Sequence, residues 1–345
     1  MPVRSVKYRV DVLRGNVPFS QMHFSDPPSI YMNADAEIKL TMRGEFLQND
    51  QFDTVRDELR PMMILDSVEY PLGVYRVGTA QTIENAAGVK RVSFEAYDRS
   101  VVLTWAKTES RDYWPAGTAY DTIIQHYLTD AGITQAVVVP SSAVLQSDRE
   151  DWDIGTSYLT IINTLLSEIN YNSLWFDLTG AARVEPYIAP NASNIAHRIG
   201  ASEGITVLRP EYTSQIDIFA QPNVFIAILE NPEYPEPMIA KAVNDTPASK
   251  LSTISRGVRI PRVYQVDNIA SAEDLQSYVE RLRNESMQLS EIVSIQTANL
   301  PGHNVGDVVA LTHPDLTGLF REISWSMTLQ AGALMSHTIQ RVVVI

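Results

Sequence analysis

Alternating apolar and polar residues mark the clearest strands of this sequence. Residues 37–44 place Ile38, Leu40 and Met42 on one face and mainly charged side chains on the other, which is the pattern of a half-buried β-strand. Residues 322–329 alternate in the same way. The side chains expected to point inward there are Ile323, Trp325, Met327 and Leu329. Both segments predict sheets that pack one face against a core.

Residues 60–77 predict two strands joined by a turn. An apolar stretch ends at Asp66 and Ser67, and apolar residues then return at alternating positions. Pro71 and Gly73 interrupt the second strand. Because proline cannot donate a ladder hydrogen bond, that strand is expected at a sheet edge or beside a bulge.

Residues 111–200 change to helical spacing. Apolar residues three and four apart predict a first helix, with Thr118 and Asp121 as a capping box and Gly132 at its end. A second helix is expected to begin near residues 155–157. A hairpin then follows, with strands at residues 174–178 and 182–187. This middle region is therefore expected to be a compact α+β unit.

Residues 201–345 return to strands around one embedded helix. Ser271 and Asp274 predict the N-terminal cap of that helix. Strands are expected over residues 291–297, 322–329 and 336–345, and a turn feeding a strand over residues 301–311. The proline-rich residues 231–237 predict a long exposed loop or an arm that reaches a neighbouring subunit.

The order of these elements predicts a mainly β fold with an α+β insert. Short strands separated by turns are typical of small barrels or sandwiches. We expect a first β-barrel domain over residues 1–110, a helix–hairpin domain over residues 111–200, and a second β-barrel domain with one embedded helix over residues 201–345.

This succession of parts resembles the tail hub, or baseplate hub, proteins of bacteriophages and phage-derived contractile particles. The resemblance rests on the Pro71-Leu72-Gly73 strand, the helix–helix–hairpin insert with its aromatic-rich strand, the embedded helix, and the turn and strand at residues 305–309. It covers nearly the whole chain. Some relatives carry a lysozyme-like or peptidase domain. None is expected after Ile345, so wall-cutting activity would belong to a separate chain.

The resemblance implies a structural function and a set of partners. Such hubs are homotrimers whose subunits each contribute two similar barrels, so that six barrels match the sixfold tail tube. The implied role is a ring that joins the tail tube protein to the central spike protein, contacts other baseplate or tail-tip proteins and leaves a channel. The implied location is a virion tail or phage-like baseplate, assembled in the bacterial host cytoplasm.

Composition narrows the classes of function. The formal net charge is −14 and no Lys/Arg cluster occurs, so tight binding of nucleic acid is not expected. Cysteine is absent, which rules out disulfides, thiolate metal sites and cysteine nucleophiles. The apolar runs are too short for a membrane span, and the N-terminus lacks the apolar region of a secretory signal.

Motifs of catalysis and ligand binding are missing from the sequence. It has no nucleophile elbow, phosphate-binding glycine loop or zinc-protease helix, so we expect no enzyme and assign no catalytic, cofactor-binding or metal-binding residue. The six histidines are separated along the chain, and His126 is expected on the polar face of the first helix. The acidic loop at residues 148–153 is interpreted as an exposed run before a helix, with a bound cation as the alternative.

Two other functions remain open from the sequence alone. One is a distal tail or receptor-binding module of a long-tailed phage, which would bind host saccharide through Trp114, Trp152 and Trp175. The other is a cell-wall hydrolase. Its paired carboxylates cannot be chosen from the acidic residues by sequence alone.

Overall fold

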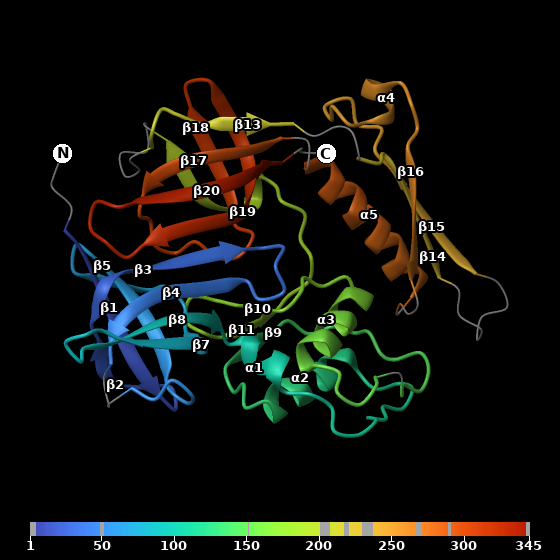
Figure 1. Ribbon diagram of the computed structural model, residues 1–345. Helices are drawn as coiled ribbons and strands as arrows, with labels where there is room; N and C mark the ends of the chain where they lie inside the picture. Colours follow the sequence, from blue (N-terminus) through green and yellow to red (C-terminus); the bar gives the residue numbers. More distant parts are fainter. Residues whose placement is uncertain are drawn as a thin grey trace.

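The computed structural model describes residues 5–48, 52–150, 152–200, 208–216, 221–229, 237–266, 269, 271–288 and 291–342. Figure 1 shows an N-terminal β part with a C-terminal β part above it, a helical insert beside the first, and a peripheral sheet with its own helix beside the second. The proline-rich loop expected at residues 231–237 lies outside the described residues apart from Pro237.

The N-terminal β part consists of eight strands and a short helix. These are β1 (Val6–Arg14), β2 (Val17–Met22), β3 (Phe24–Asn33), β4 (Leu40–Leu47), β5 (Glu58–Leu65), β6 (Val68–Pro71), β7 (Tyr75–Glu84), β8 (Lys90–Asp98) and α1 (Ser100–Trp105). The pairing order is β3-β4-β8-β7-β5-β1-β2, and every one of these pairs is antiparallel. Strand β6, which contains Pro71, pairs with β5 alone among the described strands, as expected for an edge strand.

The helical insert follows α1. It contains α2 (Tyr120–Asp130), β9 (Ala136–Val138), α3 (Tyr158–Glu168), β10 (Trp175–Phe176) and β11 (Ala182–Val184). The strands β10 and β11 form the expected hairpin, and β9 adds to β11 in parallel. The apolar faces of α2 and α3 share one core with this small sheet. Apolar residues at helical spacing therefore bury one face of each helix.

The ends of the insert helices confirm two of the three expected signals. Gly132 has φ +78° and its N–H donates to Thr129, while Ile133 donates to Leu128, which closes α2 as a Schellman motif. Ser157 caps α3 by accepting from the N–H of Thr160 at 3.2 Å. The expected capping box at Thr118 is wrong. Helix α2 starts one residue later, and the Thr118 hydroxyl instead donates to the carbonyl of Pro115 at 2.7 Å.

The peripheral sheet is a unit that the sequence did not separate from the C-terminal strands. It contains β14 (Val224–Leu229), β15 (Met238–Val243), α4 (Thr253–Arg256), β16 (Pro261–Val266) and α5 (Ala272–Gln288). The strand order is β15-β14-β16, and α5 packs over one face to form a core of its own. Ser271 caps α5 as expected, since its hydroxyl accepts from the N–H of Asp274 at 3.0 Å and donates to the Asp274 carboxylate.

The C-terminal β part completes the large sheet. It contains η1 (Ala192–Asn194), β12 (Ile195–Gly200), β13 (Thr213–Gln215), β17 (Ile292–Ala298), β18 (Val308–His313), β19 (Leu316–Thr328) and β20 (Leu334–Arg341). The order β13-β17-β20-β19 continues into β3, and β18 carries β12 on its other side. The pair β12–β18 is parallel, whereas the pairs of the N-terminal part are all antiparallel. The described strands form a mainly β fold with an α+β insert, which confirms the expected fold class.

Strand β19 joins the two β parts. Its first half pairs with β18, and its second half pairs with β3 from Ser324 opposite Asn33 to Thr328 opposite Ser29. The register shifts between Glu322 and Ser324 where the strand passes from one partner to the other. Trp325 and Met327 lie beyond this shift in the core of the N-terminal part. The N-terminal core is therefore completed by residues from the far end of the chain.

The register shift also corrects one expected side-chain direction. Continuous alternation predicted Ile323 inward, but Ile323 is only half-buried while Phe320 and Glu322 before it are fully buried. A β-bulge inserts an extra residue and so moves the inward positions along the strand by one. Trp325, Met327 and Leu329 are buried as expected because they all lie after the bulge.

Truncation of Met327 tests the role of this shared strand. Its side chain is 2% exposed within the N-terminal core, so we expect Met327→Ala to lower the free energy of unfolding by about 2–5 kcal/mol through lost contacts and a cavity. Chemical denaturation measures this change. Thr328→Ser on the same strand, which keeps the hydroxyl facing Ser29 at 3.1 Å, should change stability by less than about 1 kcal/mol. Equal effects of the two changes would contradict the assignment of Met327 to this core.

Acid sensitivity tests a second contact of the N-terminal part. Arg14 makes two hydrogen bonds of 2.7 Å to the buried carboxylate of Asp57, which hold the pKa of Asp57 below its ordinary value of 3.8. A lowered pKa in the folded state adds stability above pH 3.8, and that stability is lost as the pH falls through the folded-state pKa. We therefore expect the melting temperature of Asp57→Asn to fall less than that of the parent between pH 5 and about 3. Asp153→Asn, at an exposed carboxylate, should leave the parent's acid profile unchanged.

Candidate functional site

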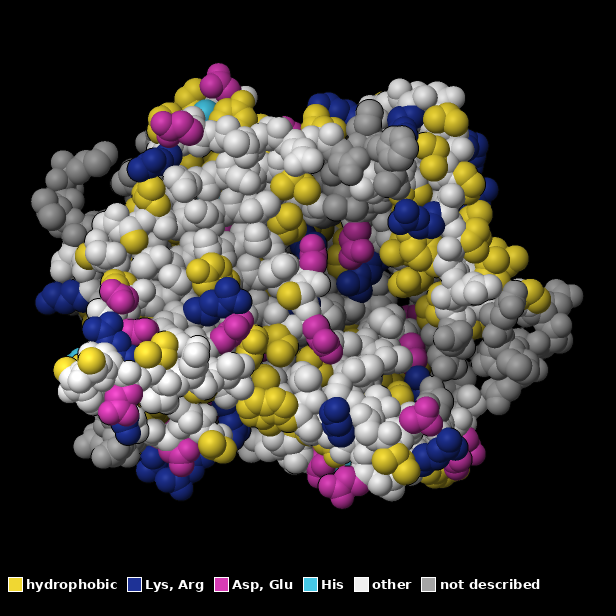
Figure 2. Space-filling model, viewed as in Figure 1, with side chains coloured by type: hydrophobic (Ala, Val, Ile, Leu, Met, Phe, Trp, Pro, Cys, Tyr) yellow, Lys and Arg dark blue, Asp and Glu magenta, His cyan; other side chains and the backbone are white. Residues whose placement is uncertain are grey.

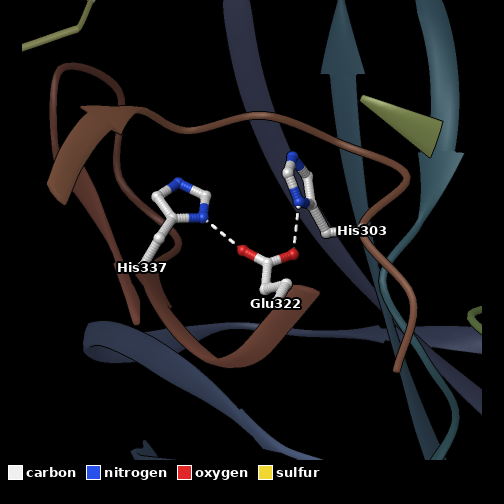
Figure 3. A group of neighbouring side chains, drawn as sticks. All are labelled: His303, Glu322 and His337. Atoms are coloured by element: carbon white, nitrogen blue, oxygen red, sulfur yellow. Dashed lines mark hydrogen bonds and ion pairs between the residues drawn. The ribbon is translucent and has the colours of Figure 1, made fainter. Parts of the chain in front are cut away.

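Two imidazoles and one carboxylate meet in the interior at the bulge of β19. Glu322 on β19 accepts from Nδ1 of His303 at 2.7 Å and from Nδ1 of His337 at 2.5 Å. Figure 3 shows both rings directed at the two oxygens of the same carboxylate. Glu322 is 0% exposed, and the two histidines are 1% exposed each. We call these three residues the junction cluster.

Local structure explains how the junction cluster is assembled. His303 lies in the loop 299–307 between β17 and β18, and His337 lies on β20 opposite Trp325 of β19. The N–H of Glu322 donates to the carbonyl of Asp307 at 2.8 Å, so the same loop is fixed to β19 beside the carboxylate. Glu322 points inward in the same alternation as Phe320, just before the bulge, so its side chain lies between the loop and β20.

Further polar residues extend the junction cluster on both sides. The ring of His197 stacks on His303 with centroids 3.8 Å apart and 9° between planes, and its Nε2 lies 3.0 Å from Asp307. On the other side, Nε2 of His337 lies 2.8 Å from the hydroxyl of Thr297. Nε2 of His303 is buried and has no hydrogen-bond partner among the described residues. The chain of contacts thus runs from Asp307 to Thr297 through three histidines and one glutamate.

The charges of this network follow from its contacts. Burial opposes ionisation of Glu322, but the contacts with His303 and His337 outweigh it and lower the pKa of the carboxyl to about 2. Burial lowers the pKa of His303, so this ring is neutral at pH 7. Burial also acts to lower the pKa of His197, yet the hydrogen bond to Asp307 outweighs it and raises that pKa. Glu322 is therefore a buried anion held by imidazoles.

Sequence spacing missed the junction cluster. We treated the histidines as separate, but the fold brings His197, His303 and His337 together from β12, a loop and β20. One available signal was Glu322, a charged residue at the start of a strand that was expected to bury one face. A second was the polar pair Thr297 and His337 on predicted strands. Neither identified its partner, because strand pairing across the chain is not visible in residue spacing. His126 is exposed on α2, as expected.

A cleft of about 470 Å³ lies where the parts of the molecule meet. Asp35 and Lys39 of the N-terminal part, Trp175 of the insert, Arg281 of α5 and Arg321 of β19 line it. Figure 2 shows acidic and basic side chains gathered near the centre of this face and apolar side chains over the peripheral sheet. The mixed charges of the cleft are suited to holding the parts in place and favour no single class of small ligand.

The acidic loop at residues 148–153 contains both exposed and buried side chains. Asp148, Glu150 and Asp153 are exposed as expected, and the carboxylate of Asp148 accepts from the N–H of Ala116 at 2.8 Å and the hydroxyl of Tyr113 at 2.9 Å. Arg149 and Trp152 are instead buried, with Arg149 paired to Glu168 at 2.5 Å. Asp151 lies outside the described residues. The buried residues anchor the loop to the insert core.

The aromatic residues considered for saccharide binding do not form one platform. Trp152 is 6% exposed in the insert core, which corrects its assignment to a binding surface. Trp114 is partly buried against the same core, and Trp175 lines the cleft. No helix in the described part of the chain is long and apolar enough to span a membrane.

The fold is that of phage tail proteins. No protein-family model matches this sequence, and no curated protein matches it significantly. Among solved structures, it is similar to a tail protein from Neisseria meningitidis MC58, with 10% identity, a TM-score of 0.67 and 97% of each chain covered. It is equally similar to the 43 kDa tail protein of prophage MuSo2 from Shewanella oneidensis, with 11% identity, a TM-score of 0.67, and 96% of this chain and 98% of that chain covered.

A component of a bacterial secretion system also has a similar fold. An Escherichia coli type VI secretion component, described as structurally similar to the T4 bacteriophage tail proteins gp27 and gp5, has 10% identity and a TM-score of 0.56. The alignment covers 97% of this chain and 77% of that chain. These similarities confirm the expected resemblance to tail proteins at the level of the fold.

A double substitution tests the buried ion pair of the insert. Glu168 is 4% exposed and accepts from Arg149 and from the hydroxyl of Tyr120 at 2.9 Å. We expect Arg149→Met alone to lower the free energy of unfolding by about 3–5 kcal/mol, because it leaves a buried carboxylate without its cation. The double variant Arg149→Met with Glu168→Leu should recover much of that loss in the same denaturation measurement. A strictly additive loss would contradict the coupling.

Proposed function

We propose that this protein is a structural hub of a phage or phage-like tail baseplate. The observation that carries the proposal is similarity over nearly the full length of this chain and of two tail proteins. Its own sheet supports this role, since one strand connects both β parts and holds them in a fixed arrangement. In this role the chain performs no catalytic step and is located in the tail of the particle.

The proposed assembly is a homotrimeric ring. It joins the sixfold tail tube to the threefold central spike, contacts other tail-tip proteins and leaves an axial channel. A ring of three identical chains requires a heterologous interface that closes after three rotations. Each subunit therefore needs two different complementary surfaces, and at least one is expected to be apolar.

The open face of the peripheral sheet is our candidate for one of these surfaces. Helix α5 covers one face, while Ile239 on β15 and Val263 on β16 remain 65% and 54% exposed. Ile228 lies opposite Ile239, and Ile226 lies opposite Val263, so four aliphatic side chains form a continuous patch. We call these residues the aliphatic face. Contiguous apolar surface of this kind commonly marks a protein interface.

Light scattering tests both the assembly and the surface. We expect a mass three times that of the 38.5 kDa chain, either for the protein alone or after mixing with the tube or spike protein. Ile239→Glu should shift the population to monomer, because it places a charge in an apolar contact. Ile83→Glu, at a residue 52% exposed on β7, is the matched control and should leave the trimer intact. A strict monomer with both partners present would reject the proposed ring.

The proposed channel should carry DNA without binding it. The net charge of −14 and the absence of a basic cluster motivate a neutral to acidic wall. We expect no duplex binding at low salt in a fluorescence anisotropy titration up to about micromolar protein. Tighter binding that weakens steeply with added salt would indicate a basic lumen and exclude the conduit role.

A further inference from the structure

The junction cluster brings together side-chain atoms of the kinds that bind metal ions in proteins. One ligand atom each from His303, Glu322 and His337 lie within 4.8 Å of one another, and all three residues are buried. Figure 3 shows the two Nδ1 atoms approaching the carboxylate from either side. The three ligands come from three backbone segments, so together they enclose a point at the bulge.

A polar residue on the far side of the His337 ring fixes the orientation of that ring. The Thr297 hydroxyl lies 2.8 Å from the carbonyl of Ala298, and a carbonyl only accepts, so the hydroxyl proton points to Ala298. The contact between Thr297 and Nε2 of His337 then needs the proton of Nε2. Nδ1 of the same ring lies 2.5 Å from the Glu322 carboxylate. Nδ1 and a carboxylate oxygen are therefore the ligand atoms that these two residues offer to the cluster.

The ligand types select among metal ions. Two imidazole nitrogens and one carboxylate form a set that binds Zn²⁺ in proteins and leaves a fourth position for water. Imidazole also suits Co²⁺, Ni²⁺ and Cu²⁺, whereas Ca²⁺ and Mg²⁺ prefer oxygen ligands. A histidine bound through Nδ1 commonly donates its other N–H to an orienting partner. Thr297 is placed to accept that N–H from His337.

We propose that His303, Glu322 and His337 bind one divalent transition-metal ion of the Zn²⁺ class through Nδ1, a carboxylate oxygen and Nδ1. Each ring binds the ion as a neutral imidazole with its proton on Nε2, so the Nδ1 proton of His303 moves to its Nε2, and a proton between His337 and the carboxylate leaves to solvent. The ion connects the loop 299–307 to β19 and β20 at the point where β19 passes from β18 to β3. Its role is to stabilise this passage, and it is independent of the hub assignment.

Metal content tests the proposal directly. The full chain is produced in medium supplied with Zn²⁺, passed through a chelating resin and measured by plasma mass spectrometry. We expect about one zinc ion per chain, and about tenfold less in Glu322→Gln and in His303→Gln. His313→Gln is the matched control, since His313 is a buried histidine that bonds the carbonyl of Pro210 instead, and it should retain the metal. Zinc below about a tenth of an equivalent in the parent overturns the site.

Spectroscopy of the parent protein tests the metal site without any substitution that impairs folding. Protein produced with Co²⁺ should show visible absorption bands of low-coordinate nitrogen-ligated cobalt. With Zn²⁺, long-range ¹H–¹⁵N spectra should show two histidines bound through Nδ1. Spectra identical with and without Zn²⁺, or shifts at His23 and His126 alone, would mean that the junction cluster holds protons only and would overturn the proposal.

Discussion

Strand β19 is hydrogen-bonded to β18 at one end and to β3 at the other, while β20 follows it along most of its length. One edge of β19 pairs first with β18 and then with β3, and the pairing of its other edge with β20 shifts register between Glu322 and Ser324. The order of the strands on both sides is continuous, and Trp325 and Met327 complete a core built mainly from residues before position 100. One strand therefore belongs to both β parts.

A buried carboxylate and two buried imidazoles lie at the same point. A carboxylate without partners in a protein interior costs several kcal/mol, so Glu322 persists there only because His303 and His337 hold it. Removing His303 or His337 leaves the buried charge of Glu322 with one hydrogen bond fewer. The stacked His197 does not replace that bond, because its Nε2 is engaged with Asp307. The hydrogen bonds of Glu322 to both histidines thus fix the loop 299–307 and β20 beside the bulge, while Nε2 of His303 is left without a partner among the described residues.

The periodicity of the sequence predicted the types of element well and their connections poorly. Features that depend on neighbouring residues were confirmed. They are the apolar faces of α2 and α3, the start of α3, the cap of α5 and the edge strand with Pro71. The peripheral sheet was not separated, because three short strands beside a helix have the same local pattern as a barrel segment. Ile323 was misplaced because a bulge changes the inward direction without any signal in the alternation. The junction cluster depends on pairing between distant strands, and for that reason spacing could not predict it.

Electron images of the protein bound to tail tube protein test the central claim most directly. We expect class averages of a ring with threefold symmetry around an open axial channel, stacked against the end of a sixfold tube. Three copies of the fold in Figure 1 should fit the ring density without separating the two β parts. Single particles attached to the side of the tube, or a ring of another symmetry, would contradict the assignment of this chain as a hub.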